Sequence, residues 1–454
     1  MASTTISFFT DMVQQIAERG RALVGLPRDG ARTASDLTLR AEELLSGSGE
    51  ASSVARARDL LESYAAATIE TRRGFLSSLA TAFGPDETKI AAAVAAYTAA
   101  PGPRTAMALH LAAEPRRQEL FRKLNRAPSG TLALVRLRED VLSEMPREPA
   151  LADVDADFKH LFTSWFNRGF LTLRRIDWSS RAHVLEKIIQ YEAVHRIENF
   201  EDLKRRLAPA DRRLYAFFHP ALVDEPLIFV EVALTREIPG AIGTILAPQR
   251  SGIAAADATT AVFYSISNCQ TGLAGISFGN FLIKQVVEEL TRDLPQLKTF
   301  VTLSPVPGFG KWLTKELEDD ASPFVSAEER EALGRYFKPD WHTDEAAIEA
   351  LREPLRGLGA TYLTRAKTSK GQPVDPVARF HLGNGARLER GHALADTSVR
   401  ALDQAAGLMV NYLYDLDTIE RNHEAFAERG EVAMSSEVRR LAKPQRALRA
   451  IQAD

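Results

Sequence analysis

Cysteine is almost absent from this chain of 454 residues, which contains only Cys269. A single cysteine excludes a framework of internal disulfides and is typical of proteins that work in reducing compartments. The chain also lacks an apolar run of the length that a membrane-spanning helix requires. Near the N-terminus, Asp11 and Glu18 interrupt the order of basic and apolar residues that marks a targeting segment. We therefore expect a cytoplasmic protein that does not bind a membrane.

An excess of charge of one sign is also missing, because 57 Lys and Arg are balanced by 60 Asp and Glu, giving a net charge of −3. This balance provides no electrostatic basis for binding nucleic acid or an anionic membrane. The histidines do not stand at metal-ligand spacing from one another or from nearby carboxylates. We therefore expect neither a nucleic-acid partner nor a metal site.

Helical periodicity fills the first third of the chain. Alanine is abundant there, β-branched runs are scarce, and proline and glycine divide the apolar pattern into pieces. The pieces are Ser35 to Leu45, Val54 to Ala66, Arg72 to Phe83, Thr88 to Tyr97 and a divided stretch from Thr105 to Ser143. Because the composition shifts at Pro146, Pro149 and the acidic run that follows, we predict two domains. Residues 1–160 are predicted as a helical oligomerisation domain, and residues 161–454 as a second, catalytic domain.

Strand signals begin in the second domain. Short runs rich in β-branched and aromatic residues are Phe170 to Ile176, Leu214 to His219, Leu227 to Leu234, Val262 to Ser267 and Thr299 to Leu303. Helical patterns such as Ala182 to Tyr191 separate them, which predicts a mixed sheet of the α+β class. Glu231 interrupts one apolar run. It is either a buried carboxylate suited to acid–base chemistry or a sheet residue with a hydrogen-bond partner.

The rest of the second domain is organised around Thr259 to Phe309. The pattern predicts a strand, a loop with Gly272, Gly275 and Gly279, a helix and a second strand that ends at Ser304. A glycine loop before a helix suits an anion, because the first helical N–H groups lack internal partners and the helix dipole adds positive charge. The spacing is neither the dinucleotide fingerprint nor the P-loop pattern, so a plain structural turn stays open as the alternative.

The loop resembles a degenerate form of the pyrophosphate loop of the N-acetyltransferase superfamily. More specifically, ordered blocks across the second domain resemble the malonyl-CoA decarboxylase family. The blocks are SWFNRGFLTLRRIDW (Ser164 to Trp178), LEKIIQYEAVH (Leu185 to His195), FFHPALVDEPLIFVEVALT (Phe217 to Thr235), FYSISNCQTGLAGISFGNFLIK (Phe263 to Lys284), TFVTLSPVPGF (Thr299 to Phe309), ARFHLGNGA (Ala378 to Ala386) and GLMVNYLY (Gly407 to Tyr414). The resemblance implies an N-acetyltransferase-like mixed-sheet fold for the second domain.

The resemblance also implies roles for individual residues. Ser304 matches the family's catalytic serine, His381 its catalytic histidine and Tyr414 its active-site tyrosine. The loop residues that would bind the substrate are Gln270, Thr271, Gly272, Gly275, Ser277, Gly279 and Asn280. Ser277 departs from the pattern, since some members carry an acidic residue there. What orients His381 is therefore open, and Glu231 is one candidate.

The implied reaction is the decarboxylation of malonyl-CoA to acetyl-CoA and CO2. The thioester accepts the electrons of the breaking bond, so no cofactor is expected. The resemblance further implies that His381 exchanges the proton with the α-carbon, that Ser304 hydrogen-bonds the malonyl group, and that the protein is a homotetramer. The alternatives are a coenzyme A-dependent acyltransferase and a non-catalytic acyl-CoA-binding regulator. Whether methylmalonyl-CoA is a substrate, what contacts the adenosine 3′-phosphate and which pathway the enzyme serves are left open.

Overall fold

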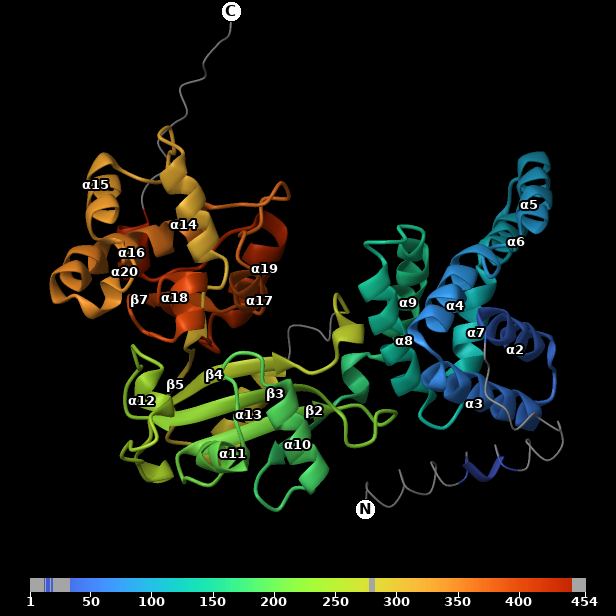
Figure 1. Ribbon diagram of the computed structural model, residues 1–454, viewed down its shortest axis with the longest axis horizontal. Helices are drawn as coiled ribbons and strands as arrows, with labels where there is room; N and C mark the ends of the chain where they lie inside the picture. Colours follow the sequence, from blue (N-terminus) through green and yellow to red (C-terminus); the bar gives the residue numbers. More distant parts are fainter. Residues whose placement is uncertain (1–11, 13, 17, 19–32, 277–281, 443–454) are drawn as a thin grey trace, which may run out of the picture. The chain divides into compact units, whose positions relative to one another are not determined.

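The structure is a computed structural model that describes residues 12, 14–16, 18, 33–276 and 282–442 (Figure 1). The chain forms two compact units. The first contains residues 1–172 with two later segments, Phe218–Leu227 and Gln270–Phe278, and the second contains the remainder. Residue 160, where the sequence divides the domains, lies inside a helix of the first unit.

The first unit is built from helices that follow one another with short connections. They are α2 (Ala34–Ser46), α3 (Glu50–Ala66), α4 (Ile69–Thr81), α5 (Glu87–Ala99), α6 (Pro103–Ala113), α7 (Arg116–Leu124), α8 (Gly130–Glu144) and α9 (Leu151–Trp165). Local chemistry sets several starts: Thr33 and Asp36 form a reciprocal capping box, and Asp86 caps α5. The helical character predicted for this part of the chain is confirmed.

The core of the first unit combines aromatic packing with buried ion pairs. Phe121 of α7 stacks on Phe158 of α9, with ring centroids 4.1 Å apart, and both side chains are fully buried. The guanidinium groups of Arg117 and Arg138 pair with Asp157 and Asp155, respectively. These charges tie α7 and α8 to α9 in an environment with little water to screen them.

The second unit is organised on one eight-stranded sheet whose order is β1-β2-β3-β4-β5-β8-β6, with β7 paired to β8. The strands are β1 (Thr172–Ile176), β2 (Arg212–Phe218), β3 (Pro226–Thr235), β4 (Thr260–Asn268), β5 (Thr299–Thr302), β6 (Ser304–Pro305), β7 (Arg387–His392) and β8 (Met409–Leu413). The pair β4–β5 is parallel and the pairs β3–β4 and β7–β8 are antiparallel, so the sheet is mixed. The α+β class predicted from the sequence is confirmed.

Helices accompany the sheet along its length. They are α10 (Ala182–Tyr191), α11 (Phe200–Leu207), α12 (Gly243–Leu246), α13 (Leu282–Asp293), α14 (Phe309–Glu318), α15 (Ala327–Tyr336), α16 (Glu345–Arg365), α17 (Pro376–Gly383), α18 (Val399–Ala405), α19 (Ile419–Arg429) and α20 (Ser436–Leu441). Short 3₁₀ turns complete the structure: η1 (Arg168–Phe170), η2 (Ala255–Asp257), η3 (Thr271–Leu273) and η4 (Trp341–Thr343). In Figure 1, α14 to α20 gather at the β7 side of the second unit.

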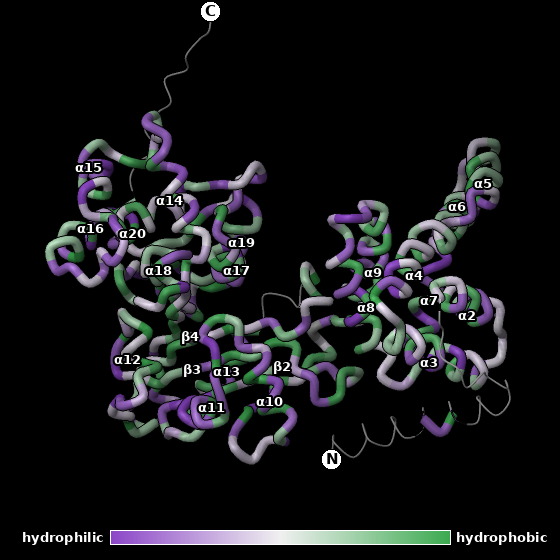
Figure 2. The backbone as a smooth tube through the Cα atoms, in the orientation of Figure 1, coloured by the Kyte–Doolittle hydropathy of each residue, from purple (hydrophilic) through white to green (hydrophobic). Residues whose placement is uncertain are grey.

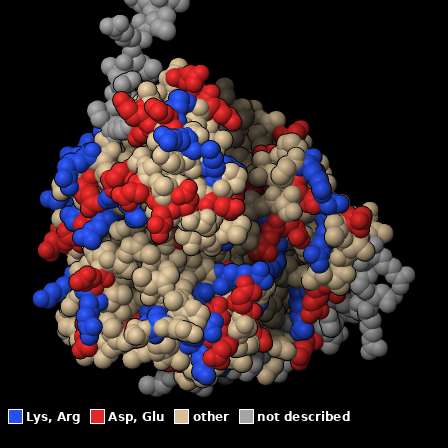
Figure 3. All heavy atoms as spheres, turned by 60° about the vertical axis from the view of Figure 1, so that its left-hand side comes forward, with Lys and Arg blue, Asp and Glu red and all other residues tan. Residues whose placement is uncertain are grey.

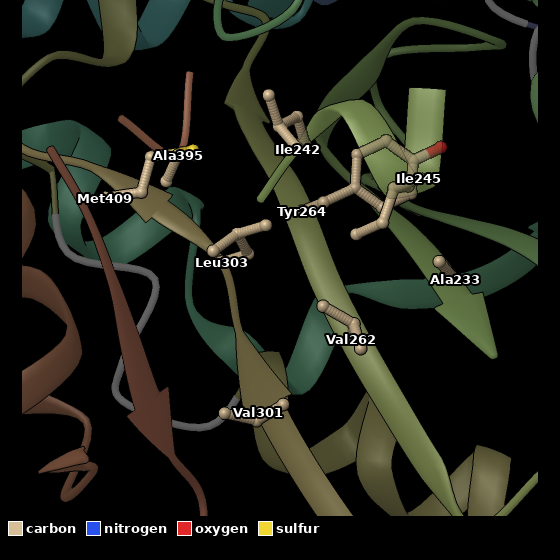
Figure 4. Packing of buried hydrophobic residues seen from close by; sticks show 9 residues of the cluster. All are labelled: Ala233, Ile242, Ile245, Val262, Tyr264, Val301, Leu303, Ala395 and Met409. Atoms are coloured by element: carbon tan, nitrogen blue, oxygen red, sulfur yellow. The ribbon is translucent and has the colours of Figure 1, made fainter. Parts of the chain in front are cut away.

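One face of the sheet is closed by an apolar cluster (Figure 4). The sheet contributes Val262 and Tyr264 of β4 and Val301 of β5. These side chains pack against Ile242, which precedes α12, and Ile245, which lies within α12. Figure 4 labels the full set, which adds Ala233, Leu303, Ala395 and Met409. Because all nine are buried apolar side chains at or near the central strands, this cluster fixes β3, β4, β5 and β8 as one rigid layer.

The central parallel pair separates part-way along its length. β4 and β5 are in register from Thr260 and Thr299 as far as Phe263 and Thr302. Beyond that point β4 continues to Asn268, whereas the segment that follows β5 becomes β6 and pairs with β8. Pro305 has no N–H to donate, which favours this departure from the ladder. Beyond Phe263 the chain that follows β5 no longer pairs with β4, and this separation is the feature that positions the site described below.

Among the helices that the structure describes, none combines the length and apolarity needed to cross a bilayer. The surface carries charges of both signs: Figure 3 shows basic and acidic side chains interspersed over one face. Within the described ranges, no group of three or more His, Cys, Asp or Glu side chains is arranged to hold a metal ion.

Candidate active site

Ser304, His381 and Tyr414 lie together in the second unit and form a continuous line of hydrogen-bonding groups. His381 Nε2 is 3.2 Å from Ser304 Oγ, and His381 Nδ1 is 2.7 Å from the hydroxyl oxygen of Tyr414. Ser304 Oγ in turn donates to Thr302 Oγ1 at 2.9 Å. All three predicted residues are buried, with 6, 3 and 2% of their surfaces exposed, respectively. We call them the Ser–His–Tyr trio.

Each member of the trio comes from a different element, and local sequence explains its position. Ser304 begins β6, where the chain leaves β5 and pairs with Val410 of β8. Tyr414 directly follows β8, and its N–H donates to the Phe300 carbonyl. His381 lies in the last turn of α17, a helix that starts with Pro376 at its first position and is capped by Asp375. The cap therefore fixes the helix that presents the imidazole.

The burial of the trio determines where its protons reside. Burial raises the pKa of the Tyr414 hydroxyl well above its usual value, so it remains a phenol and a donor. Burial lowers the pKa of His381 to about 3, so its imidazole is neutral near pH 7. In a neutral imidazole one nitrogen donates and the other accepts, so Ser304 and Tyr414 engage the two ring nitrogens of His381 in complementary roles.

A pocket of about 230 Å³ opens beside Ser304 and His381. Its walls are β4, the start of β6, one side of α17 and Val194. The lining residues are Val194, Phe263, Tyr264, Ile266, Asn268, Ser304, Pro305, Pro376, Val377, Phe380 and His381. Most of these side chains are apolar, so an anionic group that enters would be poorly solvated and would meet few polar groups besides the trio.

A second layer of polar groups supports the trio, and sequence reasoning did not identify it. The Tyr412 ring stacks on His381, with centroids 4.5 Å apart. Asp375 is fully buried, and its Oδ1 accepts from the Ala378 N–H at 2.8 Å. Thr302 Oγ1 accepts from the Tyr412 N–H. For Tyr412, the only sequence signal was the alternation of side chains along β8. For Asp375, it was the position directly before Pro376.

Of the loop residues predicted to bind the substrate, Gln270, Thr271, Gly272 and Gly275 belong to the first compact unit. Gln270 is buried, and its Nε2 donates to the Pro226 carbonyl at 3.0 Å. Thr271 and Gly272 form η3, and Gly275 has φ +75°, a conformation that a side chain would strain. Ser277, Gly279 and Asn280 lie outside the described residues.

With this geometry in hand, the chain can be compared with known proteins. The family model for the malonyl-CoA decarboxylase C-terminal domain matches residues 169–452, and the model for the N-terminal domain of the same family matches residues 83–166. The chain belongs to the malonyl-CoA decarboxylase family.

Similarity to individual members extends over most of the chain. The mitochondrial malonyl-CoA decarboxylases of Anser anser anser and Mus musculus are 40 and 36% identical over 71 and 73% of this chain, covering 69 and 72% of their own lengths. The crystal structure of malonyl-CoA decarboxylase from Rhodopseudomonas palustris is 56% identical, covers 90% of this chain and 100% of its own, and superposes with a TM-score of 0.88. The corresponding protein of Agrobacterium vitis gives a TM-score of 0.86 at 56% identity. The family assignment and the decarboxylase activity of the family therefore agree with the resemblance found in the sequence.

Of the two interpretations of Glu231, a sheet residue with a hydrogen-bond partner is the one that the structure supports. Glu231, considered as the group that orients His381, is fully buried on β3, and its Oε2 lies 3.2 Å from Arg206 NH1. Burial raises its pKa to about 7, Glu192 adds to the increase and Arg206 opposes it. His381 is instead held by Tyr414. The apolar run around Glu231 could not reveal this partner, because Arg206 lies on α11, a separate element.

Proposed function

We propose that this protein decarboxylates malonyl-CoA to acetyl-CoA and CO2 at the Ser–His–Tyr trio. The family supplies the carboxy-lyase activity and the substrate. The observation that carries the assignment of the site is the 3.2 Å contact between Ser304 Oγ and His381 Nε2 at the wall of a mostly apolar pocket. A hydroxyl and an imidazole in such a pocket can bind a carboxylate and exchange a proton without a bound cofactor.

The pocket favours the loss of CO2 because it solvates the malonyl carboxylate poorly. When the bond between the α-carbon and the carboxylate breaks, its electron pair moves to the α-carbon and is delocalised onto the thioester oxygen as an enolate. Charge is then spread over a larger group, which an apolar site tolerates better than a localised carboxylate. Ser304 is the group that orients the malonyl moiety by hydrogen bonding.

His381 supplies the proton that the reaction consumes. Its imidazole is neutral in the free enzyme because it is buried. A malonyl carboxylate brought next to it raises its pKa, so the ring takes up a proton together with the substrate. After CO2 leaves, that proton passes to the α-carbon of the enolate and gives the methyl group of acetyl-CoA. Tyr414 keeps the ring in the orientation needed for this transfer.

The proposal is tested by measuring acetyl-CoA formation from malonyl-CoA. His381→Ala and Ser304→Ala should each lower kcat by about 10²- to 10⁴-fold, the usual contribution of positioned acid–base groups. His342→Ala is the matched control, because this histidine lies in η4, away from the trio, and should retain full activity. Turnover that survives in both site variants would remove the trio from the mechanism. A folded parent that binds coenzyme A without turnover would instead indicate an acyl-CoA-binding regulator, and acetyl transfer to an amine would indicate an acyltransferase.

We further propose that residues 1–160 form an oligomerisation domain and that the protein assembles as a homotetramer. The support lies in α5 and α6, which pack on each other. Across Glu87–Ala99 and Pro103–Ala113, every residue of which the structure describes, no side chain is buried. The exposed apolar residues are Val94, Tyr97, Met107 and Leu111, and the two helices are largely pale to green in Figure 2.

A second copy of this chain is the proposed partner of that apolar surface. Light scattering should give a mass near four chains, and Met107→Glu together with Leu111→Glu should lower it. An unchanged mass would show that another surface carries the assembly.

For the location of the protein in the cell we propose the cytoplasm, in line with the single buried cysteine. The goose and mouse relatives are named mitochondrial, so fractionation of the source cells decides between the two compartments.

A further inference from the structure

The loop that starts at Gln270 is held by a buried arginine of the helical unit. Arg138, on α8, has no exposed surface. Its NH1 donates to the Gly272 carbonyl at 2.6 Å and its NH2 to the Ala274 carbonyl at 2.8 Å. The remaining side of the guanidinium faces Asp155 of α9, with Nε 2.9 Å from Oδ1. One planar cation therefore joins α9 to two backbone carbonyls of the loop.

Close packing reinforces these hydrogen bonds. The Gly272 N–H donates to Glu139 Oε1 at 3.3 Å, so this residue is bonded to α8 through both its N–H and its carbonyl. A Cβ atom on Gly272 would lie 2.0 Å from the Val135 carbonyl oxygen, a distance at which the backbone of loop or helix must shift. Gly272 is therefore required by the contact with α8, whatever the loop binds.

The contacts also determine which way the backbone of the loop faces. In a trans peptide the carbonyl and the following N–H point in opposite directions. Because the Ala274 carbonyl points at Arg138, the N–H of Gly275 points away from α8. Ala274 and Gly275 are both exposed, and φ of +75° at Gly275 continues the turn. The loop thus presents the Gly275 N–H on its outer side, and a backbone N–H is a group from which a phosphate oxygen accepts.

We infer that Arg138 is a positioning residue for the coenzyme A-binding loop, specifically for the pyrophosphate of the substrate. This inference rests on the proposed function and on the role that the family resemblance implies for Gln270 and the residues that follow, which is to bind malonyl-CoA. It gives the helical unit a role in substrate binding besides the role in assembly. Arginine suits the position because its planar fork serves Asp155 and two carbonyls at once, which the single ammonium of lysine cannot do in the same geometry.

The test compares Arg138→Lys with a matched variant, Arg117→Lys. Arg117 is also buried in the helical unit and also pairs with an aspartate of α9, but its remaining contact is to the Leu79 carbonyl of α4 rather than to the loop. We expect Arg138→Lys to raise KM for malonyl-CoA and Kd for free coenzyme A by about tenfold, with kcat changed less than about threefold. Arg117→Lys should leave KM, Kd and kcat within about twofold of the parent values. It should lower the melting temperature by about as much as Arg138→Lys does.

Equal changes in KM in the two variants, or no change in Arg138→Lys, would overturn the inference. If Arg138→Lys does not fold, Gly272→Ala tests the same contact from the loop side and should also raise KM and Kd. Its control is Gly334→Ala in α15, where an added Cβ meets no atom within 4 Å. Normal KM and Kd in folded Gly272→Ala would likewise overturn it. A parent that binds coenzyme A without decarboxylation would refute the proposed function, while the Kd comparison would still decide the role of Arg138.

Discussion

The helical unit and the Ser–His–Tyr trio bury polar groups in opposite ways. In the helical unit the buried groups are charged, as in Arg117 with Asp157 and Arg138 with Asp155. At the Ser–His–Tyr trio they are neutral: burial keeps the pKa of His381 low and that of the Tyr414 hydroxyl high. Both arrangements satisfy the buried donors and acceptors, but they differ in what they permit.

A buried ion pair holds two elements at a fixed geometry and resists any change of charge, because either charge left alone is poorly solvated. A neutral set of hydrogen-bonded hydroxyl and imidazole groups costs less free energy to bury than an ion pair. It can become charged when a bound substrate supplies a charge of the opposite sign. We therefore expect the helical unit to hold its shape and the trio to change its protonation when the proposed substrate binds. The following predictions test that distinction.

The largest effect on stability is expected from breaking an ion pair of the helical unit. Asp157→Ala removes the partner of Arg117 and also the acceptor of Gln118 Nε2. The uncompensated buried guanidinium should lower the free energy of unfolding by about 3–5 kcal/mol. Urea denaturation measures this loss, and Asp153→Ala on the exposed face of α9 is the control, expected within about 0.5 kcal/mol. A small loss for Asp157→Ala would show that water reaches the pair and that its charges are not truly buried.

Tyr414→Phe removes the hydrogen bond between the Tyr414 hydroxyl and His381 Nδ1 and should lower kcat by about tenfold, because the ring loses the contact that holds its orientation. Steady-state assays give kcat, and the melting temperature should change little. Tyr412→Phe is the matched variant: it keeps the ring that stacks on His381 and removes a hydroxyl without a hydrogen-bond partner among the described residues. A loss as large in Tyr412→Phe would assign the effect to ring packing rather than to the hydrogen bond.

Sequence patterns predicted the parts of the fold that depend on neighbouring residues. The unit from β4 to β5 was predicted closely, as Val262 to Ser267 against Thr260–Asn268 and Thr299 to Leu303 against Thr299–Thr302. Strand and helix periodicities act over a few residues, so they can be recognised without the tertiary structure. The strands β6 to β8 were not predicted, because β6 has only two residues and β8 owes its place to pairing with three other strands.

The site was less accessible to such reasoning. Ser304, His381 and Tyr414 are separated by 77 and 33 positions, so no local spacing brings them together. They were identified by resemblance to a family, and their roles as a unit are part of the proposed function. Asp375, Thr302 and Arg138 carried no pattern at all, since their significance lies in contacts with residues far away in the chain or in the way they end an element.

The pH dependence of kcat should reveal the proton uptake of His381. The pKa of about 3 in the free enzyme lies below the usual 6.5, so the stability linked to this histidine is present above pH 6.5 and lost as pH falls toward 3. In the proposed mechanism the malonyl carboxylate raises that pKa in the substrate complex, and the protonated ring is the active form. We therefore expect kcat to fall as pH rises through the raised value, whereas no group of the trio titrates in free enzyme between pH 5 and 8. A kcat that instead increases with pH would contradict proton donation by His381.

The smallest effect is expected at Glu231, a buried carboxylate of the second unit that lies beside an arginine and yet has a raised pKa. Its pKa of about 7 means that it is partly protonated near neutrality, beside Arg206 and away from the trio. Because this pKa is raised from 4.5, the wild-type protein is favoured at low pH and loses that advantage as pH rises through 7. Glu231→Gln should keep kcat within about twofold, and its stability relative to wild type should improve between pH 4.5 and 7.5. Denaturation at several pH values measures the trend. A large loss of kcat would return Glu231 to the active site, and a stability difference independent of pH would show that the carboxylate is ionised throughout and held by Arg206 alone.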